Sequence, residues 1–392
     1  MAYPLNLPFV QGERACIALI AALFACVVLI KAWGGGITVD EPSHLLSASI
    51  YWRGGYTLPP RDMPPLIRIV GGWATRIWPL PIPADLGKKG DERQEWIESI
   101  IMAEKLPNHD AVHRAFFPAR ASLIIFPLGI LLLVWWWGRQ LFDPWTGVAT
   151  AAFLALDPTF RGHSGLFKND LAAAFGYVLF WFAAWNYWRG PSRRNGFLLA
   201  AAATVGLLAK LSMIVLIPIA LIVVAMRANA KSAATSALAC ILVPWAISIA
   251  VAPHEAERIS ARDIDHIGVQ YRNQVPGFVP AAGRVFQIVP VSRPLWEGVI
   301  SLILNNSAES PNYFLGELAA KGSPWYFALA FAVKWPLPLL AVFVFGTIAI
   351  VSNRPDAETL AFILTRRSRN QIGLQFQKVG ASCEVRPKAH GY

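Results

Sequence analysis

The chain is dominated by apolar runs long enough to cross a lipid bilayer. The first extends from Ala15 to Trp33, and a helix of about 20 apolar residues spans the hydrocarbon. Seven further runs follow, at about 121–137, 147–162, 171–188, 197–209, 212–226, 233–252 and 325–351. Since 55% of the residues are hydrophobic and 16 are Trp, the sequence predicts an all-α polytopic membrane bundle, with about eight crossings and interfacial helices on its outer face.

The distribution of basic residues predicts the orientation of this bundle. The net charge of +11 is concentrated in short loops and in the tail, which is typical of cytoplasmic segments rather than of nucleic-acid binding. The basic residues are Arg139, Arg189, Arg193, Arg194, Arg227, Lys231, Arg366, Arg367 and Arg369. We therefore expect a transmembrane region over 1–351, outer loops at 34–120 and 253–324, and a basic cytoplasmic tail at 352–392.

The stretch 197–226 is too long for one crossing, and both its flanks are basic. An even number of crossings follows, so the chain should turn near Lys210–Ser212 and leave Lys210 at the outer face. A lysine at this depth either faces a polar cavity or snorkels to the interface from a helix end.

An adjacent pair of acids, Asp40 and Glu41, follows the first apolar run and three glycines. Asp40 is placed to cap a helix, with Pro42 in its first turn. His44 lies four residues on and would share its helix face. Two interpretations stay open: the acids form part of a site, or Asp40 only caps an interfacial helix.

The outer face gathers most of the unusual polar residues. They include Asp40, Glu41, His44, Arg61, Arg68, Arg161, His163, Lys168, Asp170, Lys210 and Lys334. Carboxylates beside cations suit a substrate with a phosphate and a sugar, because a carboxylate can take a proton while cations stabilise a departing phosphate. The alternative is a transporter or flippase, which is disfavoured because the polar residues cluster at one face and no inverted repeat is visible.

No cofactor is indicated by a motif. The four cysteines have no CxxC or Cys/His metal spacing, and no phosphate-binding loop is present. His109 and His113 are four residues apart, but without a third ligand a solvated helix face is favoured over a metal site. A divalent metal is possible but unsupported.

Four short segments resemble the GT-C glycosyltransferases, in particular the branch of protein mannosyltransferases and aminoarabinose transferases, which use polyprenyl-phosphate sugars. The first outer loop matches through Asp40-Glu-Pro-Ser-His44, Tyr51-Trp52 and Arg61-Asp-Met-Pro-Pro-Leu66. The other three segments are Leu156-Asp-Pro-Thr-Phe160 through Asp170, Gly206-Leu-Leu-Ala-Lys210, and Phe314-Leu-Gly-Glu317 through Lys334-Trp-Pro-Leu-Pro338. The similarity covers roughly 15–350.

The resemblance implies an inverting sugar transfer on the outer face, without a metal or with weak metal assistance. By match to the family's first-loop acid, Asp40 would be the general base, while Glu41 and Asp170 would orient the acceptor or the sugar. The residues expected to bind the substrate or its phosphate are His44, Arg61, Arg68, His163, Lys210 and Lys334. The donor would be a polyprenyl-phosphate sugar, the acceptor a protein or a glycolipid, and the location a bacterial inner membrane with the site facing the periplasm.

The chain departs from the family pattern in two places. Met63 precedes Pro64-Pro65, where the family usually has His or Lys, so Arg61 or Arg68 would have to contact the phosphate. After Val351 the chain turns polar and basic, where family members continue with further helices, and we expect a C-terminally truncated member. Both departures favour the alternative of a non-catalytic GT-C-like protein that binds a lipid carrier or a partner.

Overall fold

The computed structural model describes a helical protein. It covers residues 10–52, 64–77, 109–227, 232–251, 253, 256–261, 278–307, 312–319, 323, 325–334, 340–341, 344–348 and 352. Its described elements are helices apart from short strands of two or three residues, so the predicted all-α bundle is confirmed. Three described helices are long and apolar enough to span a bilayer, over Glu13–Gly34, His113–Leu141 and Ala233–Ala250. Eight crossings stay a prediction.

The chain divides into two compact units, Met1–Pro336 and Leu337–Tyr392. In the second unit, short helical pieces at 340–341 and 344–348 are described. Residues 78–108 of the predicted first outer loop lie outside the described residues, as does nearly all of the predicted tail.

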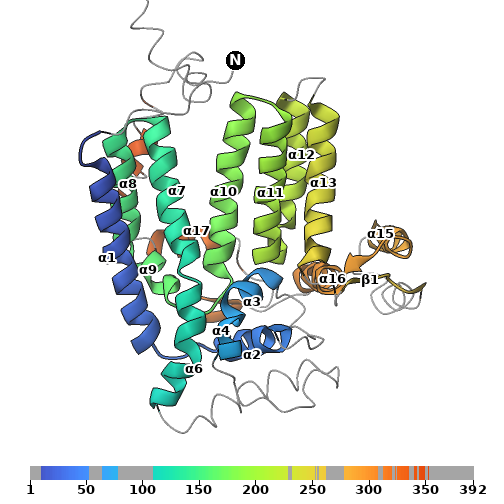
Figure 1. Cartoon of the computed structure of the whole chain (residues 1–392), viewed down its shortest axis with the longest axis horizontal. Helices are drawn as coiled ribbons and strands as arrows, with labels where there is room; N and C mark the ends of the chain where they lie inside the picture. The colour runs from blue at the N-terminus through green and yellow to red at the C-terminus, as the bar shows by residue number, and fades with distance from the viewer. Residues whose placement is uncertain are drawn as a thin grey trace, which may run out of the picture. The chain divides into compact units, whose positions relative to one another are not determined.

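One group of apolar helices comprises α1 (Glu13–Gly34), α7 (Ile125–Leu141) and α8 (Pro144–Leu156), which lie side by side (Figure 1). Asp143 begins α8 by accepting the N–H groups of Trp145 and Thr146, an N-cap that satisfies two free helix donors. Phe24, Leu131 and Ala151 are buried where the three helices meet.

A buried ion pair joins the beginning of α1 to the end of α7. Arg139 Nε lies 2.7 Å from Glu13 Oε1, and both side chains are 0% exposed. Trp135 donates its indole N–H to the same carboxylate, and the Arg139 guanidinium lies 5.1 Å from the centre of the Trp136 ring. Arg139 is one of the basic residues that predict cytoplasmic loops, but its charge is neutralised inside the protein, so it carries less weight for orientation than an exposed loop arginine.

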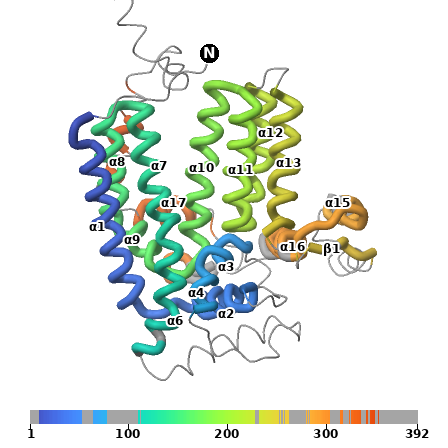
Figure 2. Tube along the Cα trace, in the orientation of Figure 1, coloured from blue at the N-terminus to red at the C-terminus, as the bar shows by residue number. Residues whose placement is uncertain are grey.

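The second group comprises α10 (Asp170–Arg189), α11 (Arg193–Ala209), α12 (Leu216–Arg227) and α13 (Ala233–Ala250), again side by side (Figure 2). The predicted turn at Lys210 is confirmed. The α11 helix ends at Ala209, Lys210 is extended with φ −154° and ψ 129°, and a 3₁₀ helix η1 (Leu211–Val215) leads into α12.

Two glycines, Gly176 and Gly206, let α10 and α11 approach closely. A Cβ built on Gly176 would lie 2.5 Å from Gly206 Cα, and backbone cannot move aside as a side chain can. We expect Gly176→Ala to lower the free energy of unfolding by about 1–3 kcal/mol through overpacking, measured by denaturation in detergent. Gly190→Ala is the control, since its new methyl would meet only a side-chain nitrogen at 3.8 Å. Equal stability of the two variants would contradict the close packing.

Five shorter helices complete the described part of the chain up to residue 164. They are α2 (Glu41–Trp52), α3 (Pro65–Gly72), α4 (Ala74–Ile77), α6 (His109–Ser122) and α9 (Pro158–Ser164). In Figure 1, α2, α3 and α4 lie together at the end of the bundle where α1 finishes and α10 begins. A core shared by α2, α3 and α6 buries Leu45, Ile67, Phe116, Phe167 and Ala209, so this core links the first loop to α10 and α11.

Shorter elements follow α13. They are β1 (Ala256–Glu257), α15 (Phe278–Phe286), β2 (Val291–Ser292), α16 (Arg293–Ser307), β3 (Asn312–Phe314), β4 (Glu317–Ala319) and α17 (Tyr326–Lys334). Strands β1 and β2 pair antiparallel with Ala256 opposite Ser292, and β3 pairs with β4 through Phe314 opposite Glu317. The turn residues Leu315 and Gly316 both have positive φ, 51° and 95°, as a two-residue type I′ hairpin requires.

Candidate functional site

The first-loop acids are placed by a glycine-rich exit from α1. The N–H of Gly35 donates to the carbonyl of Lys31 at 2.8 Å, and a Cβ at Gly35 would lie 2.7 Å from that oxygen. A side chain would therefore clash with the end of the helix, and glycine avoids this. The chain then extends to Asp40, whose carbonyl accepts the N–H of His44 as α2 begins.

Glu41 is the buried centre of this region. Its carboxylate is bound by Arg120 through Nε at 2.7 Å and Nη2 at 2.8 Å, a two-pronged contact that the planar guanidinium favours. It also accepts the backbone N–H of Phe167 at 2.8 Å and that of Thr38 at 2.9 Å. Glu41 is 0% exposed, so its oxygens are occupied by protein donors from α6, the segment before α10, and its own loop.

Arg120 extends this network to the end of α1. Its Nη1 donates to the carbonyls of Ala32 at 3.0 Å and Gly35 at 2.9 Å, and its Nη2 donates to that of Gly36 at 2.8 Å. These carbonyls belong to a helix end, where backbone acceptors lack intrahelical partners. One arginine therefore fixes α1, the glycine exit and α2 together.

The charge state of Glu41 follows from the same contacts. Burial alone would raise the pKa of Glu41, but hydrogen bonds from Arg120, Phe167 and Thr38, with the positive charge of Arg120, outweigh it and lower the pKa below its ordinary value. An ionised carboxylate held by this many donors is a positioning group, because it has little capacity left to accept a substrate proton.

Asp40 is placed differently, although it is the neighbouring residue. Its carboxylate is 58% exposed and lies 2.7 Å from the ammonium of Lys168, which is 21% exposed. Lys168 directly follows Phe167, whose N–H holds Glu41. The buried Glu41 contact therefore keeps the Lys168 segment beside Asp40, while Asp40 itself stays accessible.

A second acid–lysine pair lies at the start of α10. Asp170 Oδ1 lies 2.9 Å from Lys210 Nζ, and the two side chains are 42% and 41% exposed. Burial would raise the pKa of Asp170, but the Lys210 hydrogen bond and the charges of Lys210, His163 and Lys168 outweigh this and lower it. Lys168 therefore acts electrostatically on Asp170 while it contacts Asp40.

These side chains form one group, which we call the Asp40–Asp170 cluster: Asp40, His163, Lys168, Asp170 and Lys210. An accessible carboxylate can accept a proton from a hydroxyl, and adjacent ammonium groups can stabilise a phosphate. Among the described residues, no three His, Cys, Asp or Glu side chains gather closely enough to hold a metal ion.

The structure does not bring two of the expected phosphate-binding residues to the surface of this cluster. His44 is 7% exposed and Arg68 is 0% exposed. The Arg68 guanidinium lies 5.7 Å from the centre of the Tyr51 ring, and the Tyr51 hydroxyl donates to the carbonyl of Val251. Both residues are therefore buried side chains of α2 and α3 rather than accessible members of the site. Asp40 and His44 are expected from the sequence to share one helix face. The Asp40 side chain is exposed, whereas that of His44 is buried.

Two further expected residues remain, Arg61 and Lys334. Arg61 and Met63 lie outside the described residues. Lys334 is exposed in the last turn of α17, and in the described part of the chain it makes no ion pair with Asp40 or Asp170.

Sequence reasoning missed Arg120 and Lys31. Lys31 lies in the last turn of α1, and its ammonium donates to the carbonyl of Gly162 in α9. A charged residue at the end of an apolar run raises the free energy of the folded chain unless it is paired. Both residues lie at such positions, so the sequence indicates that each has a partner. It does not reveal their partners, since Arg120 binds Glu41 across 79 positions of sequence.

Part of this site lies in a segment whose sequence resembles a known protein family. A family model described as dolichyl-phosphate-mannose-protein mannosyltransferase matches residues 111–254, less than half of the 392 residues. The comparison with curated proteins gave no match, and neither did that with solved structures. Residues 111–254, which hold every member of the Asp40–Asp170 cluster except Asp40, are therefore similar in sequence to that mannosyltransferase family.

Proposed function

We propose that this protein is a GT-C glycosyltransferase that moves a sugar from a polyprenyl-phosphate carrier to an acceptor hydroxyl. One observation carries the proposal: the 2.7 Å contact between Asp40 and Lys168. It joins an accessible acid outside the family match to the matched segment 111–254. A potential base and the cations of the matched segment thus lie in one site.

Asp40 acts as the general base in this mechanism. Its carboxylate accepts the proton of the acceptor hydroxyl, whose oxygen attacks the anomeric carbon of the sugar. The bond from that carbon to the phosphate oxygen breaks, and polyprenyl phosphate leaves with the electron pair. A single displacement of this kind inverts the anomeric configuration. General-base assistance typically contributes about 10²–10⁴-fold to rate.

The cations of the cluster stabilise the departing phosphate. Lys168 and Lys210 each lie within 3 Å of one carboxylate, and each ammonium retains further donors for phosphate oxygens. As negative charge develops on the phosphate, fixed cations lower the energy of the transition state. Asp170 keeps Lys210 in place and orients the sugar, while Glu41 acts as a positioning residue through Phe167 and Lys168.

The setting of the reaction follows from the predicted topology. With the cluster at the outer ends of the membrane helices, the carrier phosphate sits at the lipid boundary and its tail stays in the bilayer. We propose a multi-pass protein of a bacterial inner membrane whose site faces the periplasm, with a protein or glycolipid as acceptor.

Donor turnover by the purified full chain tests this function. The chain is mixed with a panel of radiolabelled polyprenyl-phosphate sugars and a membrane extract that supplies acceptors. Transfer of one label into a protein or glycolipid fraction is the expected result and identifies the sugar. Saturable binding of the lipid donors without transfer contradicts the enzymatic proposal and supports the non-catalytic alternative.

Replacing Lys168 by Met should impair use of the donor. The variant loses a cation within reach of the phosphate, and a hydrogen bond to a charged group contributes about 1.5–3 kcal/mol. We expect kcat/KM for the donor to fall about 10- to 150-fold, measured by initial rates at varied donor concentration. Arg194→Met, at an exposed position in the first turn of α11, serves as the control. A wild-type kcat/KM for Lys168→Met would remove Lys168 from the phosphate site.

A further inference from the structure

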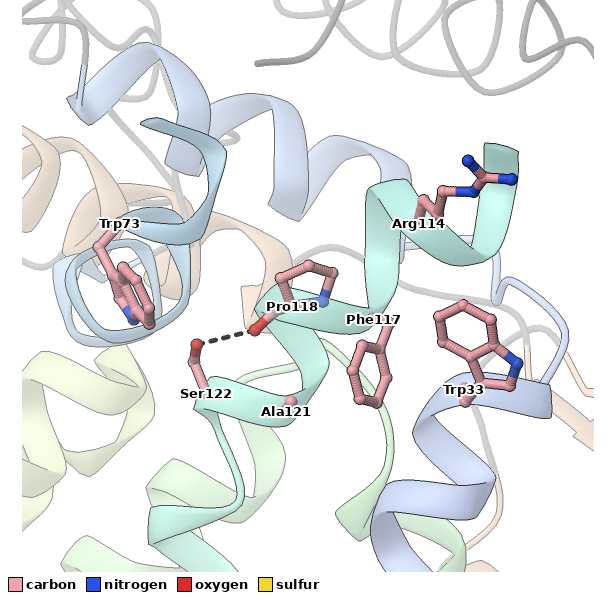
Figure 3. A pocket seen from close by; sticks show the side chains of 7 residues that line it. All are labelled: Trp33, Trp73, Arg114, Phe117, Pro118, Ala121 and Ser122. Atoms are coloured by element: carbon pink, nitrogen blue, oxygen red, sulfur yellow. Dashed lines mark hydrogen bonds between the residues drawn. The ribbon is translucent and has the colours of Figure 1, made fainter. Parts of the chain in front are cut away.

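A groove lies along α6, on the side facing away from Glu41. Figure 3 shows its lining, which comes from three parts of the chain: Trp33 at the end of α1, Trp73 between α3 and α4, and Arg114, Phe117, Pro118, Ala121 and Ser122 of α6. Its volume is about 440 Å³, within the range of about 300–1,000 Å³ typical of small-molecule sites.

The two faces of α6 separate this groove from the Asp40–Asp170 cluster. Phe116, Ala119 and Arg120 are buried on one face, and Arg120 there binds Glu41. Phe117 and Ala121 line the groove on the other face. The groove is therefore a second site, not an extension of the cluster.

The groove has the composition expected at a boundary between hydrocarbon and water. Trp33 is one residue from the end of the apolar helix Glu13–Gly34, and Ala121 and Ser122 belong to the 29-residue apolar stretch His113–Leu141. Because about 20 residues suffice to cross a bilayer, the first turns of that stretch reach the interface. Trp33 and Trp73 are 46% and 44% exposed, and indole rings are enriched at this depth in membrane proteins.

The lining changes character along the helix. Figure 3 shows Trp73 and Ser122 at one end, Ala121 and Phe117 between, and Trp33 with the Arg114 guanidinium at the other end. The rings of Trp33 and Phe117 are in edge contact, with centroids 5.3 Å apart, which gives the groove a firm apolar wall. Arg114 is exposed, has no ion-pair partner among the described residues, and is the one charged group among those that line the groove.

We propose that this groove binds an anionic phospholipid of the surrounding membrane. The lipid phosphate contacts Arg114, and an acyl chain lies against Trp33, Phe117 and Ala121. An apolar slot with a single cation at its water-facing end matches a negatively charged head above an apolar tail. The side chains that line it contain no acid to oppose such a head group. This lipid site does not depend on the proposed sugar transfer.

Fluorescence quenching by brominated lipids tests the proposal. The full chain in detergent is titrated with phosphatidylglycerol brominated in its acyl chains, and separately with phosphatidylcholine brominated at the same positions. We expect Arg114→Gln to raise the midpoint for phosphatidylglycerol about fivefold, since one basic residue near an anionic lipid surface contributes about that factor. Its midpoint for phosphatidylcholine should not change. Trp33→Phe should reduce the amplitude of the high-affinity quenching, because it removes one of the two indoles that line the groove and leaves Trp73.

Arg194→Gln is the matched control, since it removes one exposed arginine outside the groove. Equal phosphatidylglycerol midpoints for the native chain and Arg114→Gln would overturn the proposal, as would equal midpoints for the two lipids on the native chain. Displacement of the brominated phosphatidylglycerol by polyprenyl phosphate at lower concentration would overturn it as well, since the groove would then be a carrier site.

Discussion

Asp40→Asn should lower the rate of sugar transfer by at least about a hundredfold. The asparagine amide has nearly the same size and can still contact Lys168, but it cannot take up the acceptor proton. General-base assistance accounts for about 10²–10⁴-fold in rate, so the loss should appear in kcat, measured with saturating donor and acceptor.

Folding should be unaffected by this substitution. The Asp40 side chain is 58% exposed and pairs with Lys168 near the surface. Exposed ion pairs of this kind contribute about 0–1 kcal/mol. Asp110→Asn provides the control, because it neutralises an exposed acid in the first turn of α6. Near-normal turnover by Asp40→Asn in a chain that inserts and unfolds like the native one would rule out Asp40 as the base.

The parts of this site that could be predicted from sequence are those marked by polar residues in an apolar setting. Asp40, Asp170 and Lys210 stand out because an ionisable group beside an apolar membrane segment is unfavourable in free energy. Such a group therefore indicates a functional site. Charge on both flanks of 197–226 predicted the turn at Lys210, and the structure has it. Such predictions need only the position of a residue along the membrane.

What could not be predicted is which side of an element each residue faces once the elements pack. Glu41 and Asp40 are adjacent, yet one is 0% exposed and the other 58%. The difference arises because Arg120 and the N–H of Phe167 approach α2 from one side only. His44 and Arg68 are buried by the same packing. No local pattern specifies these contacts, since they depend on how α6 and the segment before α10 meet α2.

Arg120→Met should be the most destabilising of the substitutions considered. It leaves the Glu41 carboxylate buried without its cation, and breaking a buried ion pair in this way costs about 3–5 kcal/mol. It also removes the donors to the carbonyls of Ala32, Gly35 and Gly36. The free energy of unfolding, measured by denaturation in detergent, should fall by that amount, whereas Arg193→Met at an exposed position should change it little. Arg120→Lys should rescue it only in part, because an ammonium cannot reproduce the guanidinium fork.

A second substitution separates the ion pair from the other contacts of Arg120. If the Glu41–Arg120 interaction dominates, Glu41→Gln together with Arg120→Met should lower the free energy of unfolding by less than the sum of the two single changes.

The pH dependence of the free energy of unfolding has a defined sign. Because the pKa of Glu41 is lowered from its ordinary 4.5, its contribution is fully present above pH 4.5 and is lost as the pH falls through the folded pKa. The part of acid destabilisation due to Glu41 should therefore disappear in Glu41→Gln. Additive costs and an unchanged acid profile would show that Arg120 stabilises the fold mainly through the end of α1.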